Sequence, residues 1–365
     1  MLSGLSRNFL NDPDKMPDGA MIPRTENKCQ RSEWKNLLRE GFTRPGDLLN
    51  YLGLHHDKEA GFSSEQLFKL RVPQPFVDKM NPGDWHDPLL LQVLPQASEF
   101  AMAPGFGVDP LNERHQLAPE SQTLIHQAPG ILHKYRSRAL VLTTGACAIN
   151  CRYCFRRHFP YAAHQDRKDF QQVLSYFEQT TSINEAILSG GDPLMLDDDK
   201  LSSLITALKN IPHIKRIRIH TRLPVVLPQR IDDALLAWCE PSDEAKIIFV
   251  IHCNHPQELG HDTEQALKYL CDAKVTLLNQ SVLLKNINDN AQILADLSEK
   301  LFAQGVLPYY LHSLDKTQGT QHFDLSNQSI INIYRELMTL LPGFLLPRLV
   351  KDSVGASSKT PWKID

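Results

Sequence analysis

The sequence predicts an α/β fold in which repeated β/α units form a full or partial barrel. From Arg138 onward, short β-branched runs alternate with amphipathic stretches of roughly 10–15 residues, an alternation typical of βα units around a parallel sheet. Six or seven such repeats favour a barrel over a flat, doubly wound sheet. A polar cluster follows each expected strand, and in barrels of this kind the active site lies at the carboxyl ends of the strands.

The part of the chain that precedes the expected barrel differs from it in composition and pattern. About the first 25 residues are polar and rich in proline and glycine, so we expect a loose N-terminus over residues 1–31. Residues 32–129 form an expected accessory region of short helices broken by proline. These helices are predicted at 32–39, 45–51, 63–70 and 88–94.

The barrel core is expected over residues 130–343, and a C-terminal strand and loop over 344–365. Strands are predicted at 139–143, 185–188, 216–219, 246–251, 275–278, 306–311 and 344–350. Helices are predicted between them at 169–179, 200–209, 232–238, 263–271, 291–304 and 327–340.

Composition narrows the class of protein. The 365 residues are 42% hydrophobic and 22% charged, with a net charge of −3, which is ordinary for a soluble globular protein. No basic run indicates nucleic-acid binding, no apolar segment approaches the roughly 18 residues of a membrane span, and no secretory h-region is visible near Met1. We therefore expect a cytoplasmic enzyme without nucleic-acid or membrane partners.

Three cysteines fall within eight residues after the first expected strand. Cys147, Cys151 and Cys154 have the spacing C-x3-C-x2-C. Three thiolates from one loop can hold an iron–sulfur cube with one iron left open for a substrate or cofactor. A structural zinc site would need a fourth ligand, usually from a second Cys or His pair, and no second pair of cysteines exists. The spacing therefore favours an iron–sulfur site.

Polar residues at other expected strand ends each allow a structural and a functional interpretation. Gly190, Gly191 and Asp192, before Pro193, form either an ordinary turn or a backbone cradle for the amino and carboxylate groups of a small ligand. His252 and His255 are either core histidines or a metal pair, and the lack of further ligands disfavours metal. Gln280 could equally hold a loop.

The C-terminal part of the chain contributes a lysine and two acids. Lys359 is either a solvated terminal lysine or one that forms a Schiff base with a carbonyl cofactor such as pyridoxal phosphate. Asp315 and Asp352 either cap helices and pair locally, or together bind an ammonium group. Arg156 and Arg157 could hold a carboxylate in bidentate geometry.

With these residues laid out, the chain resembles the radical S-adenosylmethionine superfamily and, within it, the lysine 2,3-aminomutase family. The resembling blocks are 133–138 (HKYRSR), 151–157 (CRYCFRR), 189–194 (SGGDPL), 223–230 (LPVVLPQR), 279–284 (NQSVLL) and 358–361 (SKTP). Blocks at 70–76 (LRVPQPF), from Asp87 (DPLL) and at 103–106 (APGF) look like the bacterial branch that makes β-lysine for modification of elongation factor P.

The resemblance implies a partial barrel of the radical SAM type and three cofactors. Cys147, Cys151 and Cys154 would hold a [4Fe–4S] cluster whose open iron binds S-adenosylmethionine. Gly190, Gly191, Asp192, His252 and Gln280 would lie around that molecule. Lys359 would carry pyridoxal 5′-phosphate, with Lys134, Tyr135 and Arg138 at its phosphate, although Lys134 stands where an arginine is often found. Arg156 would bind the substrate carboxylate, and Asp315 and Asp352 its side-chain ammonium.

The implied reaction converts L-lysine to β-lysine, with the R isomer expected, after one electron from a reductant cleaves S-adenosylmethionine to a radical. The implied cellular link is to the ligase that attaches lysine to elongation factor P. Alternatives are a catabolic or osmolyte-making lysine aminomutase, an aminomutase for another amino acid, and a radical SAM enzyme that modifies RNA, which would not need Lys359. Longer family members carry a cysteine-bearing zinc tail after the pyridoxal lysine, which the sequence does not predict here.

Overall fold

The computed structural model describes residues 30–54, 68–114, 128–164 and 170–364. Outside these ranges lie residues 1–29 of the N-terminal segment expected at 1–31, most of the helix expected at 63–70, and residue 169 of the helix expected at 169–179. Residues 30 and 31 of the expected loose segment belong to the first helix. The described residues form one nine-stranded sheet in which the strands follow one another in chain order, β1 to β9. Strands β2 to β8 are parallel, whereas β1 and β9 run antiparallel to their neighbours at the two edges.

The strands are β1 Ile131–Tyr135, β2 Arg138–Thr144, β3 Glu185–Gly190, β4 Arg216–Thr221, β5 Lys246–His252, β6 Thr276–Val282, β7 Leu307–His312, β8 Arg348–Lys351 and β9 Thr360–Pro361. The longer helices are α1 Gln30–Glu40, α2 Pro45–Tyr51, α6 Gln171–Gln179, α7 Asp198–Lys209, α9 Asp233–Trp238, α10 His261–Asp272, α11 Ala291–Ala303 and α12 Asn327–Leu340. Single turns occur at α3 Gln74–Val77, α4 Pro88–Leu91, α5 Tyr161–His164 and α8 Leu223–Val226.

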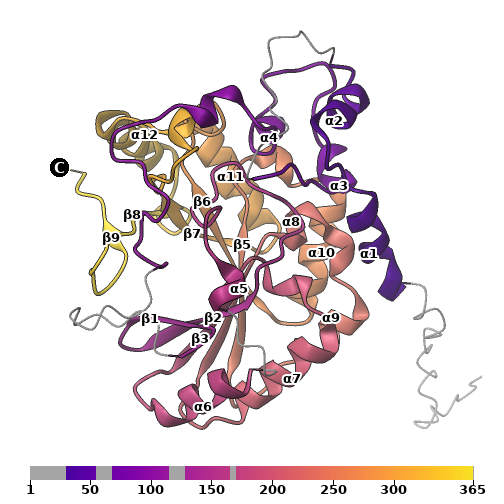
Figure 1. The fold of residues 1–365 in the computed structure, drawn as a ribbon, viewed down its shortest axis with the longest axis vertical. Coiled ribbons are helices and arrows are strands. Elements are labelled where there is room, and N and C mark those ends of the chain that lie inside the picture. Colours follow the sequence, from indigo (N-terminus) through magenta and orange to yellow (C-terminus); the bar gives the residue numbers. More distant parts are fainter. Residues whose placement is uncertain (1–29, 55–67, 115–127, 165–169, 365) are drawn as a thin grey trace, which may run out of the picture.

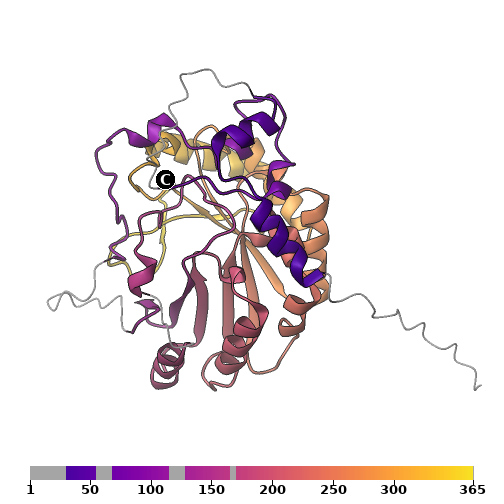
Figure 2. The same cartoon turned by 45° about the vertical axis from the view of Figure 1, so that its right-hand side comes forward.

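Apolar periodicity explains these elements. Strand β5 is a continuous apolar run whose Phe249, Val250 and Ile251 are fully buried, as expected for a strand covered on both faces. Helix α10 buries Thr263, Ala266, Leu267 and Leu270, which is the one-sided stripe of an amphipathic helix. In Figures 1 and 2 the helices lie on the outside of the curved sheet.

The α/β partial barrel is therefore confirmed, and several boundaries are corrected. Strand β6 continues through Asn279, Gln280 and Ser281, which were expected to follow it, because parallel pairing with β5 and β7 continues there. The strand expected at 344–350 forms only from Arg348, because Pro342 and Pro347 lack the N–H groups that a ladder needs. The helix expected at 88–94 ends at Leu91, and the β1–β2 hairpin and α3 were not expected.

The N-terminal helices pack against the barrel. Trp34 of α1 and Phe76 of α3 belong to the same hydrophobic cluster as Leu223 of α8 and Phe249 of β5, and α1 and α3 lie beside α8 and α10 in Figure 1. The Lys79 ammonium donates to Val225 O, Glu258 O and Thr263 Oγ1 at 2.7–2.9 Å. One core thus runs through both regions, while the domain boundaries at residues 31, 129 and 343 stay predictions.

The C-terminal segment folds back along the sheet. Val350 pairs with Pro361 and Lys351 with Thr360, so Lys359 lies directly beside the end of β8. In Figure 1 this segment, drawn in yellow, occupies the same side of the molecule as the β1–β2 hairpin. None of the helices in the described ranges has the length and apolarity to cross a bilayer.

Candidate active site

The cysteine loop follows β2 and is fixed from several sides. Asn150 N donates to Arg71 O at 2.9 Å, and Arg152 N donates to Gln92 O at 2.8 Å. The fully buried Arg152 side chain also forms an ion pair with Glu99. Because the N-terminal region supplies these partners, it determines the conformation of the loop that carries the cysteines.

The three thiols lie close enough to influence one another. Burial, and then the neighbouring cysteines, raises the pKa of the Cys147 thiol well above its ordinary value and that of Cys154 to about 11. Within the described ranges, no three His, Cys, Asp or Glu side chains are grouped as ligands of a single metal ion. A cube instead binds each thiolate to a different iron, so three half-buried thiols on one loop fit a cluster better than a mononuclear site.

The Gly190–Asp192 turn crosses the base of this loop. The Gly191 and Asp192 amides donate to Thr144 O at 2.7 Å and Ala146 O at 2.9 Å. A Cβ on Gly191 would lie 2.3 Å from Ala146 O, so glycine is needed for the close approach. These two amides are therefore used within the protein, and a ligand would have to contact the turn through other main-chain groups.

Asp192 is also used within the protein. Its carboxylate accepts hydrogen bonds from Thr221 Oγ1, Arg222 N and Leu194 N at 2.7–3.0 Å. Burial raises the pKa of this carboxyl to about 6. Asp192 thus joins the end of β3 to the end of β4.

His252 and Gln280 are brought together as register partners on β5 and β6. His252 Nε2 lies 2.9 Å from the Tyr153 hydroxyl, and the two rings stack with centroids 5.6 Å apart. Burial lowers the pKa of His252 well below its ordinary value, so the imidazole is neutral. His255, in contrast, caps a short turn by accepting a hydrogen bond from Gln257 N.

Lys359, Asp352 and Asp315 converge from separate segments. Lys359 Nζ donates to Asp352 Oδ2 at 2.6 Å. Burial opposes ionisation of Asp352, but the Lys359 ammonium outweighs it and lowers the pKa of that carboxyl. For Asp315, burial followed by the Asp352 charge raises the pKa to about 7. The predicted acid pair is therefore present, and the protein's own lysine ammonium is bound to one member.

A buried glutamate that the sequence did not single out joins two other predicted groups. Glu113 accepts from Arg156 Nε at 2.7 Å and from Lys134 Nζ at 2.7 Å. These two cations outweigh burial and lower the pKa of Glu113 to about 2. Arg156 Nη1 lies 3.4 Å from Ser189 Oγ, so Arg156 bridges the cysteine loop, β3 and the Glu113 segment.

The rest of the predicted phosphate stretch lies on the β1–β2 hairpin. The Arg138 guanidinium lies 4.2 Å from the Tyr135 ring centroid. Burial, followed by the nearby Asp352 carboxylate, raises the pKa of Tyr135 to about 12. Lys134 and Tyr135 thus lie near Asp352, and Arg138 lies against the Tyr135 ring.

Several ionisable side chains at this site were not predicted as site residues from the sequence. Burial, followed by Arg218 and Lys359, lowers the pKa of His220 well below its ordinary value, and burial and Lys359 lower that of His312 to about 3. His220 and Arg222 were visible as polar residues at a strand end. Glu113 lies in an irregular segment whose pattern gave no signal.

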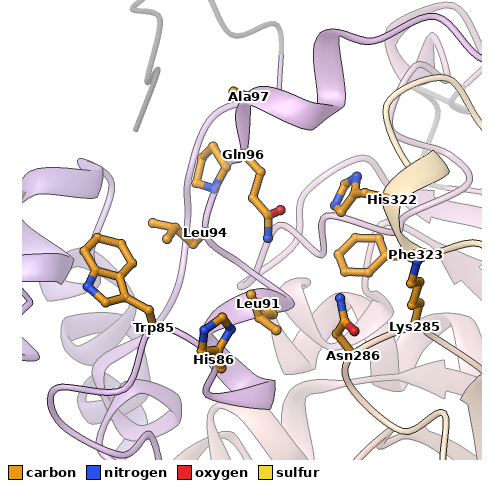
Figure 3. Close-up of a pocket in the computed structure, with 11 residues that line it drawn as sticks. Trp85, His86, Leu91, Leu94, Gln96, Ala97, Lys285, Asn286, His322 and Phe323 are labelled. Carbon is orange, nitrogen blue, oxygen red and sulfur yellow. The ribbon is translucent and has the colours of Figure 1, made fainter. Parts of the chain in front are cut away.

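A separate cavity of about 390 Å³ opens beside α4 (Figure 3). It is lined by Trp85, His86, Leu91, Leu94, Pro95, Gln96, Ala97, Lys285, Asn286, His322 and Phe323. Phe323 packs edge-to-face on Tyr153 with centroids 6.2 Å apart, so the cavity lies behind the cysteine loop. None of the predicted site residues lines it, and it is distinct from the candidate active site.

Comparison with known proteins shows the family to which the chain belongs. Over 340 residues the chain is 48% identical to the L-lysine 2,3-aminomutase of Escherichia coli strain K12, covering 92% of this chain and 96% of that protein. Identity to the L-lysine 2,3-aminomutase of Haemophilus influenzae is 47%, over 91% of this chain and 96% of the relative. The chain belongs to the lysine 2,3-aminomutase family. The enzyme of that name from Clostridium subterminale is 31% identical over 90% of this chain and 77% of its own length.

The Radical SAM superfamily pattern matches residues 141–240. This span includes the cysteine loop, the Gly190–Asp192 turn and Arg222. Membership of that superfamily implies a [4Fe–4S] cluster and S-adenosylmethionine. Among solved structures, that of Streptococcus suis SuiB aligns with a TM-score of 0.43 at 12% identity over 61% of this chain and 50% of that one, which is too weak a likeness to support an argument.

Proposed function

We propose that this protein is an L-lysine 2,3-aminomutase that uses a [4Fe–4S] cluster on Cys147, Cys151 and Cys154, S-adenosylmethionine, and pyridoxal 5′-phosphate on Lys359. The observation that carries the proposal is the contact between the Lys359 ammonium and Asp352, beside Asp315, in the same site as Arg156. A site in which one acid binds a lysine ammonium and a second acid lies nearby has the charge to bind the ammonium of a lysine substrate.

The Lys359–Asp352 pair supports both predicted roles. An unmodified lysine carries an ammonium, and Asp352 neutralises it. Asp352 and Asp315 would bind the side-chain ammonium of the substrate in any state in which the Lys359 nitrogen, as an imine or as a neutral amine, does not hold Asp352 as an ammonium. The contact seen here thus stands in for the one proposed with substrate.

The opposite end of the substrate would be bound by Arg156. Glu113 holds Nε and Nη2 of its guanidinium, which fixes the side chain and leaves Nη1 toward Ser189. A guanidinium held in this way offers a directed donor to a carboxylate. Binding both ends fixes the distance between the carboxylate and the ammonium, and this favours lysine over a shorter amino acid.

The remaining residues hold the cofactors, whose bound forms supply a primary radical and a carbonyl anchor for the substrate amino group. Lys134, Tyr135 and Arg138 would contact the phosphate of the pyridoxal group. His252, Gln280 and the carbonyl side of the Gly190–Asp192 turn would contact S-adenosylmethionine. Since the His252 imidazole is neutral, it would act as a hydrogen-bonding group and not as a counter-charge.

Product analysis tests the proposal. The reconstituted protein is incubated anaerobically with L-lysine, S-adenosylmethionine, pyridoxal phosphate and dithionite, and we expect β-lysine of the R configuration. Lys359→Ala should abolish the product and the pyridoxal absorbance while keeping iron. Cys151→Ser should lose most iron and all cleavage of S-adenosylmethionine.

Two results would contradict the proposal and favour a different function. Turnover of another amino acid in preference to lysine would make the chain an aminomutase of different specificity. Cleavage of S-adenosylmethionine without any pyridoxal bound at Lys359 would favour a radical SAM enzyme of another class, such as one acting on RNA.

We further propose that the β-lysine serves the ligase that modifies elongation factor P. Support comes from the N-terminal blocks 70–76, 87–90 and 103–106, which resemble that branch. Deleting the gene should leave the factor without β-lysyl modification, and added β-lysine should restore it. A fully modified factor in the deletion strain would point instead to a catabolic or osmolyte role.

A further inference from the structure

A buried ion pair lies directly behind the cysteine loop. Arg222, just after β4, donates through Nη1 to Cys151 Sγ at 2.8 Å. Its Nη2 donates to Gln92 Oε1 at 2.7 Å and to Glu258 Oε2 at 2.9 Å. Arg222 is 6% exposed and Glu258 is fully buried, so solvent does not screen this pair from the sulfur.

Arg222 is held rigidly. Its backbone N–H donates to Asp192 at 2.7 Å, and its guanidinium lies 5.3 Å and 5.7 Å from the ring centroids of Phe76 and Tyr153. A planar cation enclosed by two rings loses little further freedom when it binds a sulfur. The donor is therefore in place before any cluster is inserted.

Glu258 is fixed equally well. Its Oε1 accepts hydrogen bonds from Asn254 N, His255 N and Gln92 Nε2 at 3.0–3.1 Å, which leaves Oε2 for Arg222. Within the described ranges, Cys151 is the one loop cysteine whose sulfur receives a side-chain hydrogen bond. The Arg222–Glu258 pair therefore acts on the loop through Cys151.

Opposite charges next to a cluster ligand have opposite effects on reduction. Reduction adds negative charge to a cluster, so a cationic donor to a ligand sulfur stabilises the reduced form and raises the potential. A neighbouring carboxylate has the opposite effect. Each charge alone would shift the potential, and as a pair they largely offset one another.

We propose that the Arg222–Glu258 pair sets the reduction potential of the cluster through the Arg222 hydrogen bond to Cys151, so that both are positioning residues. The inference rests on the proposed assignment of the cluster to the three cysteines. It predicts that removing one charge moves the potential in one direction and removing the other moves it in the opposite direction, which a purely structural role would not do.

The test uses the full chain, reconstituted anaerobically with iron and sulfide. Midpoint potentials are measured by redox titration followed by electron paramagnetic resonance, without and with S-adenosylmethionine, alongside iron and sulfide content. Arg222→Gln should lower the ratio of reduced to oxidised cluster at a fixed potential by about tenfold, which for one electron is a shift of about −59 mV. Glu258→Gln should shift it upward, and Arg222→Lys should lie nearer the parent.

Arg230→Gln is the matched control. Arg230 is also a fully buried arginine after β4, paired with Asp198 at 2.8 Å and set against the Trp34 ring, but it has no contact with a loop cysteine. This variant should lose stability without changing the potential of the cluster it binds.

Two outcomes overturn the inference. One is a parental potential in Arg222→Gln or Glu258→Gln at full iron content. The other is failure of all three pair variants to take up a cluster while Arg230→Gln does, which would make the pair a folding element of the loop. Retention of iron by Cys151→Ser would instead refute the cluster assignment itself, so the two failures can be told apart.

Discussion

Asp315 and Asp352 carry the same side chain but have opposite pKa shifts. Asp352 contacts the Lys359 ammonium and stays ionised, whereas the half-buried Asp315 lies near the Asp352 charge. With a pKa of about 7, Asp315 changes charge near neutral pH. The site therefore has one permanent acid for an ammonium and one that is ionised only at the upper end of the neutral range.

This difference predicts a pH dependence of lysine binding. Asp315 is mostly protonated below pH 7, so the site then offers one carboxylate instead of two. We expect KM for lysine to rise as the pH falls from 8 to 6, with a smaller change in kcat. Michaelis constants measured across that range on the cofactor-loaded enzyme check this expectation.

Asp315→Asn removes the titrating group and should flatten the KM profile while raising KM at pH 8. Loss of a charge-assisted hydrogen bond costs about 1.5–3 kcal/mol, or roughly 10- to 150-fold in binding. Asp352→Asn should raise KM at every pH, because this acid is ionised throughout. An unaltered profile in Asp315→Asn would show that a group other than Asp315 titrates in this range.

At the scale of elements, the turn after β3 and the loop after β2 depend on each other. Gly191 lets the turn lie against Ala146, and Asp192 continues the contact to β4. The conformation of the cysteine loop therefore depends on the ends of β3 and β4, which contain none of the three cysteines. A change in the turn should disturb the metal site before it disturbs the sheet.

Gly191→Ala tests this coupling. The added Cβ would lie 2.3 Å from Ala146 O, a backbone atom that can move only with the cysteine loop. We expect loss of most reconstituted iron, with destabilisation of about 1–3 kcal/mol from overpacking. Gly343→Ala, where a Cβ would meet nothing within 4 Å, should change neither property. Normal iron content in Gly191→Ala would show that the loop adapts independently.

At the scale of the whole molecule, Lys79 connects the accessory helices to the barrel. Its ammonium binds three acceptors from Val225, Glu258 and Thr263, and burial lowers its pKa to about 8. In the unfolded chain its pKa is near 10.5. Between these values the unfolded state binds more protons than the folded state, so the contribution of Lys79 to stability rises with pH.

Lys79→Met should therefore destabilise the protein, by about 2 kcal/mol for the acceptors left unpaired. The difference in urea midpoint between parent and variant should widen from pH 8 to pH 10. The exposed Lys268, paired with Asp272 on α10, provides the control, and Lys268→Met should leave the midpoint and its pH dependence unchanged. A constant difference across that range would mean that Lys79 keeps an ordinary pKa when buried.

The partial α/β barrel could be predicted from the sequence, because the alternation of apolar strands and amphipathic helices is local and repeats. The cysteine loop could be proposed as a cluster site because its three thiols lie within eight residues, whereas Lys359 was proposed only through the resemblance to a family. Strand ends such as Asn279 to Ser281 were misplaced, since polar residues at a barrel rim remain in the ladder when neighbouring strands extend beside them.

Tertiary structure alone decided which charges meet. Glu113, Arg156 and Lys134 come from three segments, as do Arg222, Glu258 and Cys151. Their energies depend on burial and on distances of about 3 Å between groups dozens of residues apart. No local pattern encodes such distances, because each carboxylate and guanidinium would look like an ordinary surface charge if read along the chain. Around Arg222 and Glu258, Phe76 and Gln92 of the N-terminal region complete this burial.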